Sequence, residues 1–183
     1  SKRLNYGVMG GTSADKSPIN AAFVKLRGEQ EKLPHFQSVC ADGVDLPIAD
    51  AQLDLVCMIG SFEWMPTSWP NEDPETIHAR VLSEVLRVLK PGGEILVLDF
   101  CQPTTPLFRQ LYLFYFHKVL PAIGGLISGQ RQAYAYLPRS VGDFPQGQAF
   151  VELLDAAGFV ETGHTPLTLG ISAVYQGAKG LVD

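Results

Sequence analysis

Apolar and polar residues alternate with two different periods along this chain, and the combination predicts an α/β fold. Three short runs predict strands: residues 36–40 alternate like a strand, residues 53–59 form a continuous apolar run typical of a buried strand, and residues 95–100 form the next strand. Between the last two runs, apolar residues recur at four-residue spacing, at Ile77, Val81, Val85 and Leu89. This spacing predicts a helix that connects two strands. A strand, a helix and a strand in this order are typical of a sheet whose strands are mostly parallel.

The ends of several elements follow from local chemistry. Ser17-Pro18 supplies a hydroxyl cap and a proline for a first helical turn, so we predict a helix from there to about residue 33. Asp73-Pro74 begins the central helix, and Pro91-Gly92-Gly93 is expected to stop it. Weaker patterns predict a very apolar helix over 107–120, a helix over 146–157 and closing antiparallel strands within 167–175. We expect one domain, residues 1–183.

Composition narrows the classes of function. Hydrophobic residues make up 46% of the chain and charged residues 18%, which favours a packed core over disorder. The net charge of -5 is opposite in sign to the basic surface that nucleic-acid binding requires. No metal-ligand spacing occurs among the histidines or cysteines, so we expect no metal site and a reducing compartment. The three cysteines are interpreted as small buried core residues: Cys40, Cys57 and Cys101.

The apolar stretches are too short and too interrupted to cross a membrane. A spanning helix needs about 18 apolar residues. The most apolar stretch, residues 107–120, contains Arg109, Gln110, His117 and Lys118. The polar start of the chain does not resemble a secretory signal peptide. We therefore expect a soluble or surface-bound protein rather than a transmembrane one.

Five sequence blocks carry a family resemblance. The first is LSEVLRVLKPGGEILVLDF, residues 82–100, a helix, a sharp turn and a strand. Four more follow in order: FYFHKVLPAIGGLISG (114–129), YAYLPRSVGDFPQGQAF (134–150), LLDAAGF (153–159) and LTLGISAVYQG (167–177). Over roughly residues 12–179 the chain resembles the ubiquinone/menaquinone biosynthesis C-methyltransferases. These are class I enzymes that depend on S-adenosylmethionine (SAM). The resemblance implies a Rossmann-like fold, here expected to lack its first strand and its glycine-rich SAM loop.

The resemblance also implies a SAM site at the ends of two strands. Asp15, in ADKSP, matches the family's acid for the ribose hydroxyls, although an acid before a proline is also a common loop residue. Asp42 and Gly43, in CADGVDLP, match the family's adenine-binding loop. Because Asp-Gly is a turn dipeptide, a plain surface turn is the alternative. SAM is thus the expected cofactor if the protein is active.

Two departures from the family pattern bear on activity. Gly7, Gly10 and Gly11 come directly before Asp15 and leave no room for the helix that should separate a SAM loop from that acid. Glu63 stands where the family has an arginine proposed to help activate the substrate. A carboxylate would repel the developing phenolate that a cation stabilises, which predicts loss of that role. The alternative is that Glu63 acts as a general base.

A hydrophobic substrate would need a pocket lined by apolar side chains. Phe62, Tyr134 and Tyr136 are expected to line the pocket together with Glu63. In the family, the region of helix 107–120 helps to cover a prenylated ring near the membrane. A buried helix under a subunit interface is the alternative for that helix.

Three functions follow from these features. The first is a degenerate methyltransferase-like domain, a structural or accessory subunit of a larger membrane-associated complex. A protein partner would then cover the incomplete sheet and helix 107–120, since an open sheet edge tends to pair with other chains. The alternative is an active C-methyltransferase of a polyprenylated quinol, whose SAM loop is supplied from elsewhere. A third option is a module that binds a quinone or lipid without chemistry. We expect an organelle, mitochondrion or plastid, with membrane association.

Overall fold

The computed structural model describes residues 11–15, 18–32, 36–60, 62, 71–103, 105–115, 119 and 144–181. The chain forms two compact units, Ser1–Ile48 and Ala49–Asp183. Each unit is treated by itself below. Together the elements confirm the predicted α/β class, because strands and helices alternate along most of the chain.

The first unit is a strand, a helix and a strand. Strand β1 (Gly11–Asp15) and strand β2 (Phe36–Cys40) are parallel, and helix α1 (Pro18–Gln30) connects them. The α1 helix begins at the predicted proline and ends about three residues before the predicted residue 33. The Ser38 hydroxyl donates a hydrogen bond of 2.8 Å to the carbonyl of Ala21, which ties β2 to α1.

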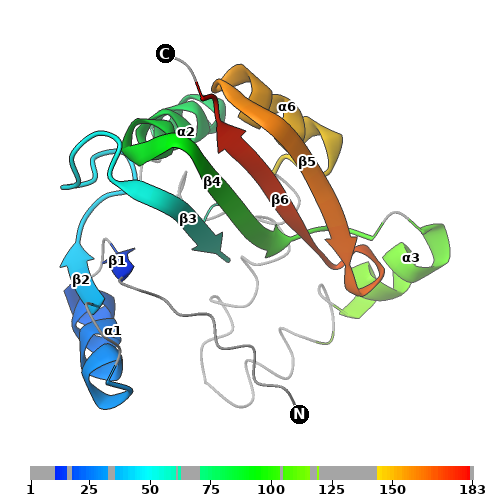
Figure 1. Cartoon of the computed structure of the whole chain (residues 1–183). Coiled ribbons are helices and arrows are strands. Elements are labelled where there is room, and N and C mark those ends of the chain that lie inside the picture. Colours follow the sequence, from blue (N-terminus) through cyan, green and yellow to red (C-terminus); the bar gives the residue numbers. More distant parts are fainter. Residues whose placement is uncertain are drawn as a thin grey trace, which may run out of the picture. The chain divides into compact units, whose positions relative to one another are not determined.

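The second unit contains a four-stranded mixed sheet, in the order β3-β4-β6-β5 (Figure 1). Strand β3 (Leu53–Ile59) pairs in parallel with β4 (Leu89–Phe100). Strand β4 pairs antiparallel with β6 (Ser172–Lys179), which in turn pairs antiparallel with β5 (Phe159–Leu167). The sheet is therefore less parallel than predicted. Of the closing antiparallel strands predicted within 167–175, β6 is confirmed, although it begins at Ser172 and extends to Lys179.

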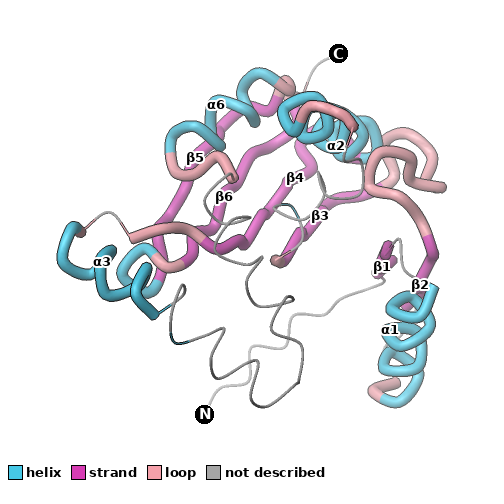
Figure 2. Tube along the Cα trace, turned by 180° about the vertical axis from the view of Figure 1, so that it is seen from behind, coloured by secondary structure: helices cyan, strands magenta, loops and turns pink. Residues whose placement is uncertain are grey.

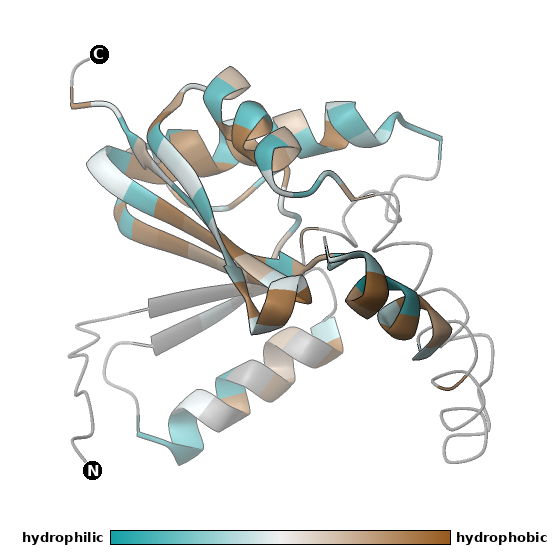
Figure 3. Cartoon of the chain, turned by 90° about the vertical axis from the view of Figure 1, so that its right-hand side faces the viewer, coloured by the Kyte–Doolittle hydropathy of each residue, from teal (hydrophilic) through white to brown (hydrophobic). Residues whose placement is uncertain are grey.

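One face of this sheet is covered by two helices. Helices α2 (Pro74–Val88) and α6 (Gln148–Ala156) contact each other and lie on the same side of the strands (Figure 2, Figure 3). Along β4, Ile95 and Val97 point to this side and are buried, while Leu96 between them is half-buried. The core of the second unit consequently lies between the sheet and α2 and α6.

Helix α2 begins as predicted but ends early. The Asp73 carboxylate accepts a 3.1 Å hydrogen bond from the Thr76 backbone N–H, which caps the first turn. The helix ends at Val88, and the Pro-Gly-Gly turn lies within the residues of β4, not directly behind the helix. A Cβ atom on Gly93 would lie 2.9 Å from the Lys90 carbonyl oxygen. Glycine is needed here because the chain bulges between two stretches of the ladder.

Strand β5 was not predicted. Its sequence, FVETGHTPL, carries too few apolar residues for a buried strand, and most of its side chains are exposed. It pairs with β6 alone among the described strands, an edge position at which polar residues and Pro166 are tolerated. A short 3-10 helix, η3 (Thr168–Gly170), joins it to β6.

Several apolar side chains of the second unit face outward. Cys57 in this unit and Cys40 in the first unit are exposed, so the prediction of buried cysteines is wrong for both and right for Cys101. Cys57 is exposed because it alternates with Met58, which takes the helix-covered face of β3. Helix α3 (Pro106–Phe114) presents three exposed apolar residues at helical spacing: Leu107, Leu111 and Phe114. Among the described residues, no helix has the length and apolarity needed to cross a membrane.

Candidate functional site

The first unit brings the two predicted SAM-binding acids to one edge. Asp15 is the last residue of β1 and pairs with Cys40, the last residue of β2. Asp42 follows two residues after Cys40. Because β1 and β2 are parallel, their carboxyl ends share an edge, and both acids lie at or just beyond it. In open α/β sheets this is the edge at which ligands bind.

Asp42 also organises the turn that contains Gly43. Its Oδ1 accepts a 3.3 Å hydrogen bond from the Val44 backbone N–H. Its carbonyl oxygen accepts a 3.1 Å bond from the N–H of Asp45. The half-buried Asp42 is therefore part of a turn, as the alternative interpretation held, and the turn sets where its carboxylate lies. A turn residue and a ligand-binding residue are compatible here, because a carboxylate has two acceptor oxygens.

Two acidic residues at this edge have the chemistry that the nucleoside half of SAM requires. Ribose hydroxyls and an adenine amino group are hydrogen-bond donors, and each needs an acceptor from the protein. The first unit supplies one acid at the end of each of two neighbouring strands, Asp15 and Asp42. Among the described residues, no group of three or more histidine, cysteine or acidic side chains could hold a metal ion.

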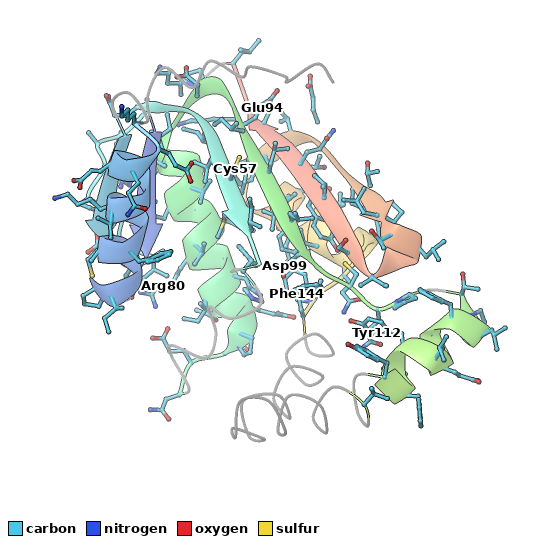
Figure 4. The ribbon with its side chains drawn as sticks, turned by 90° about the horizontal axis from the view of Figure 1, so that it is seen from below. Cys57, Arg80, Glu94, Asp99, Tyr112 and Phe144 are labelled. Atoms are coloured by element: carbon cyan, nitrogen blue, oxygen red, sulfur yellow. The ribbon has the colours of Figure 1, made fainter. Side chains whose placement is uncertain are left out.

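In the second unit, buried polar groups gather at the carboxyl ends of β3 and β4. Asp99 is 2% exposed and is the penultimate residue of β4; its Oδ1 accepts a bond from the N–H of Phe100. His78 is 3% exposed and lies in the second turn of α2, which follows β3 in the sequence. Figure 4 labels Asp99 and Phe144 in this part of the molecule. Polar side chains are rarely buried unless a hydrogen-bond partner or a function requires it. This edge is therefore a second candidate for a functional site.

A buried tyrosine connects three elements at this edge. The Tyr175 hydroxyl, on β6, accepts a 2.9 Å hydrogen bond from the N–H of Gly147, at the start of α6. It also lies 3.2 Å from the Cys101 sulfur, just after β4. Burial, and then the contact with Cys101, raise the pKa of Tyr175 well above its usual value. Tyr175 is thus a neutral structural link between β6, β4 and α6.

Aromatic rings fill the space between these polar groups. The Phe62 and His78 rings stack with centroids 4.8 Å apart. Phe150 meets Phe62 edge-on at 5.1 Å and Tyr175 at 4.4 Å. Phe144 lies 5.3 Å from Phe150. Hereafter these five residues are called the aromatic cluster: Phe62, His78, Phe144, Phe150 and Tyr175.

Burial in the cluster keeps His78 uncharged near neutral pH. Loss of solvent lowers the pKa of His78 to about 4. A hydrogen bond with the Phe62 backbone and the nearby charge of Asp73 raise that pKa and offset only part of the effect. The imidazole is therefore a neutral, fixed group at the carboxyl end of β3.

Of the four predicted pocket residues, the structure describes one. Phe62 is fully buried in the aromatic cluster, so it shapes the interior and not an open wall. Glu63, Tyr134 and Tyr136 lie outside the described residues. Sequence reasoning passed over His78 and Asp99. Asp99 lies in the block 82–100 that carries the family resemblance, whereas His78 had no pattern around it.

Comparison with known proteins assigns this arrangement to a family. Residues 14–179 match the model of the ubiE/COQ5 methyltransferase family. A demethylmenaquinone methyltransferase from Thermus thermophilus is 35% identical over 166 residues, which are 91% of this chain and 70% of the relative. Among solved structures, a SAM-dependent methyltransferase from Methanosarcina mazei aligns with a TM-score of 0.56 at 17% identity, over 93% of this chain and 82% of that one. This last likeness shows the shared Rossmann-like methyltransferase fold.

Other relatives match over a shorter segment. A ubiquinone/menaquinone biosynthesis C-methyltransferase from Geobacter sulfurreducens is 52% identical over 100 residues, 55% of this chain and 39% of the relative. A mitochondrial 2-methoxy-6-polyprenyl-1,4-benzoquinol methylase from Dictyostelium discoideum is 44% identical over 100 residues, 55% of this chain and 32% of the relative. The chain thus matches less than half the length of these two proteins.

Proposed function

Because the chain belongs to the ubiE/COQ5 methyltransferase family, we propose that it serves SAM-dependent methylation of a ring carbon of a polyprenylated quinol. The observation that carries the proposal is the placement of Asp15 and Asp42 at the carboxyl ends of adjacent parallel strands. The relatives are named as methyltransferases, and none of those compared carries the name of an accessory subunit. The enzymatic function, first considered as the alternative, is therefore better supported than a degenerate accessory domain.

In this proposal the first unit holds the cofactor. Asp15 accepts hydrogen bonds from the ribose hydroxyls, and Asp42, on the turn with Gly43, accepts one from the adenine amino group. Bound SAM supplies an electrophilic methyl group. The Asp42 turn is already held by its own hydrogen bond to Val44, so little order has to be gained when the nucleoside binds.

The expectations about the protein's location, partners and membrane contact remain predictions. One relative is named as mitochondrial, which supports an organellar location in organisms that make quinones there. We expect a protein partner, a membrane surface or a prenylated quinone to cover helix 107–120, and the exposed apolar residues of α3 support this proposal. A partner that covers the incomplete sheet is likewise a prediction.

Calorimetric titration with SAM tests the proposed cofactor site. We expect the native chain to bind SAM and Asp42→Asn to bind it about tenfold more weakly, which corresponds to about 1.4 kcal/mol. Asparagine keeps one side-chain oxygen for the Val44 N–H, so the turn is retained while the second acceptor oxygen is lost. The affinity of the matched control, Asp45→Asn in the same turn, should equal that of the native chain. Equal weakening by both substitutions, or no heat from the native chain at millimolar SAM, would refute the assignment.

A further inference from the structure

Exposed apolar side chains gather at one edge of the sheet in the second unit. Strands β3, β4 and β5 all end at this edge, as their arrowheads in Figure 1 show. Each ends in a large, exposed apolar residue: Ile59 is 70% exposed, Phe100 43% and Leu167 38%. Leu169, in the η3 turn that follows β5, is 76% exposed. Hereafter these four residues are called the edge patch.

The three strand-end residues of the edge patch point to the same face of the sheet. Ile59 and Phe100 each follow a buried residue of the helix-covered face, and successive residues of a strand point to opposite faces. Both side chains therefore point away from the helices. Leu167 and Phe100 both pair with Ser172, and directly paired residues share a face. From β3 to β5 the patch crosses three strand spacings, about 14 Å.

The sequence around the edge patch carries almost no charge. Residues 166–172, which include the η3 turn, contain no acidic or basic residue. Within two positions of Ile59 or Phe100, the one charged residue is Asp99, which is 2% exposed and lies on the opposite face. Protein interfaces usually have a polar rim, whereas sites for small ligands are lined mainly by apolar side chains. The patch therefore fits an uncharged, apolar ligand.

The η3 turn holds Leu169 at this edge against the preference of its backbone. Thr168 and Leu169 have φ values of 46° and 58°, and Gly170 follows at 86°. Left-handed conformations are unfavourable for residues with a Cβ atom, and they normally occur singly. Two backbone hydrogen bonds retain the turn: the Ile171 N–H donates to the Thr168 carbonyl at 3.2 Å, and the Ile171 carbonyl accepts from the Cys101 N–H at 2.7 Å. An exposed leucine in such a turn adds little to folding, and backbone outliers cluster where function requires them.

We propose that the edge patch binds the prenyl chain of the quinol. The proposal rests on the proposed function, because that function defines the ligand as a ring with an apolar tail. The patch lies at the carboxyl ends of β3 and β4, the edge at which α/β sheets bind ligands. A quinol whose ring is bound at this edge places its tail on the exposed apolar side chains beside it. Contact with the tail removes these side chains from water, which favours binding.

Equilibrium dialysis of one hydroquinone with and without a farnesyl chain, in the absence of SAM, tests the proposal. We expect the native chain to bind the farnesylated compound about tenfold more tightly. Leu169→Gly should reduce this advantage about fivefold, because an apolar contact is lost. The same change should raise the unfolding midpoint by about 2 °C, because glycine adopts the left-handed turn without strain. Ile59→Thr keeps a β-branched strand residue and should reduce the advantage about threefold.

The matched control is Leu181→Gly. Leu181 is 80% exposed and lies close to Gly92, near the start of β4 and so at the opposite edge of the sheet. Its replacement should leave the advantage of the farnesyl chain unchanged. The proposal is overturned if Leu169→Gly and Ile59→Thr bind both compounds like the native chain, or if Leu181→Gly weakens binding of the farnesylated compound as much as they do.

Two further results separate this proposal from its alternatives. If Ile59→Thr lowers the apparent mass in gel filtration while the advantage of the farnesyl chain stays native, the patch is an interface between copies of the chain and the proposal is overturned. Dialysis involves no methyl transfer, so binding of the farnesyl chain at the patch without transfer to a quinol retains the patch and refutes the proposed function. Methyl transfer without any advantage from the farnesyl chain does the reverse.

Discussion

Replacing Phe150 with alanine is expected to lower the free energy of unfolding of the second unit by about 3–5 kcal/mol. Phe150 is fully buried in α6 and contacts three other rings of the aromatic cluster, those of Phe62, Phe144 and Tyr175. Its loss removes apolar contacts from every side and leaves a cavity that these rings cannot close by small shifts. Alanine is the better helix former by about 0.5 kcal/mol, which offsets a small part of the loss.

Urea denaturation followed by circular dichroism measures this effect. Phe114→Ala in α3 is the matched control, because Phe114 is 60% exposed; that change should stay within about 0.5 kcal/mol of the native value. A loss below about 1 kcal/mol for Phe150→Ala would show that the aromatic cluster is not the core of this unit.

Acidification is expected to lower the free energy of unfolding of the second unit by up to about 3 kcal/mol through protonation of His78 alone. In the folded protein burial lowers the pKa of His78 to about 4, whereas the ordinary value near 6.5 applies after unfolding. The folded state therefore disfavours the proton. This contribution to the free energy of unfolding, which comes from keeping His78 uncharged, is fully present above about pH 6.5 and is lost as the pH falls through 4. The charged neighbour that opposes this shift is Asp73, at the start of α2.

The test is the unfolding free energy of the native chain and of His78→Phe from pH 7 to pH 4. The difference between the two proteins should grow as the pH falls, because phenylalanine cannot take up a proton. His164→Phe should follow the native curve. Parallel curves for the native chain and His78→Phe over this range would contradict a buried, uncharged His78.

The strands show which features could be predicted from the sequence. The bounds of β2 and β3 agree with the predicted residues 36–40 and 53–59, because alternation in β2 and a continuous apolar run in β3 leave each strand little freedom to shift. The start of α2 was also predicted, from its cap. Strand β5 was not, because it is held by its ladder with β6 and not by an apolar pattern of its own. The early end of α2 depends on the pairing of Leu89 with Leu53, a long-range contact.

The candidate site was likewise predictable only in part. Asp15 and Asp42 lie at neighbouring strand ends, as their motifs predicted, since a motif fixes a residue relative to its own strand. Phe62 was expected to line a pocket and lies instead inside the aromatic cluster. The surroundings of His78 and Tyr175 are set by packing between α2, α6 and β6. Contacts between elements so far apart in the chain cannot be predicted from the local sequence.

Transfer of a labelled methyl group from SAM to a short-chain hydroquinone tests the central claim most directly. The chain should be assayed with two acceptors, one with an unsubstituted ring carbon and one with every ring position substituted. We predict label on the ring carbon of the first and none on the second, in which only the hydroxyl oxygens could react. No label on either acceptor, or equal label on both, would contradict a quinol C-methyltransferase.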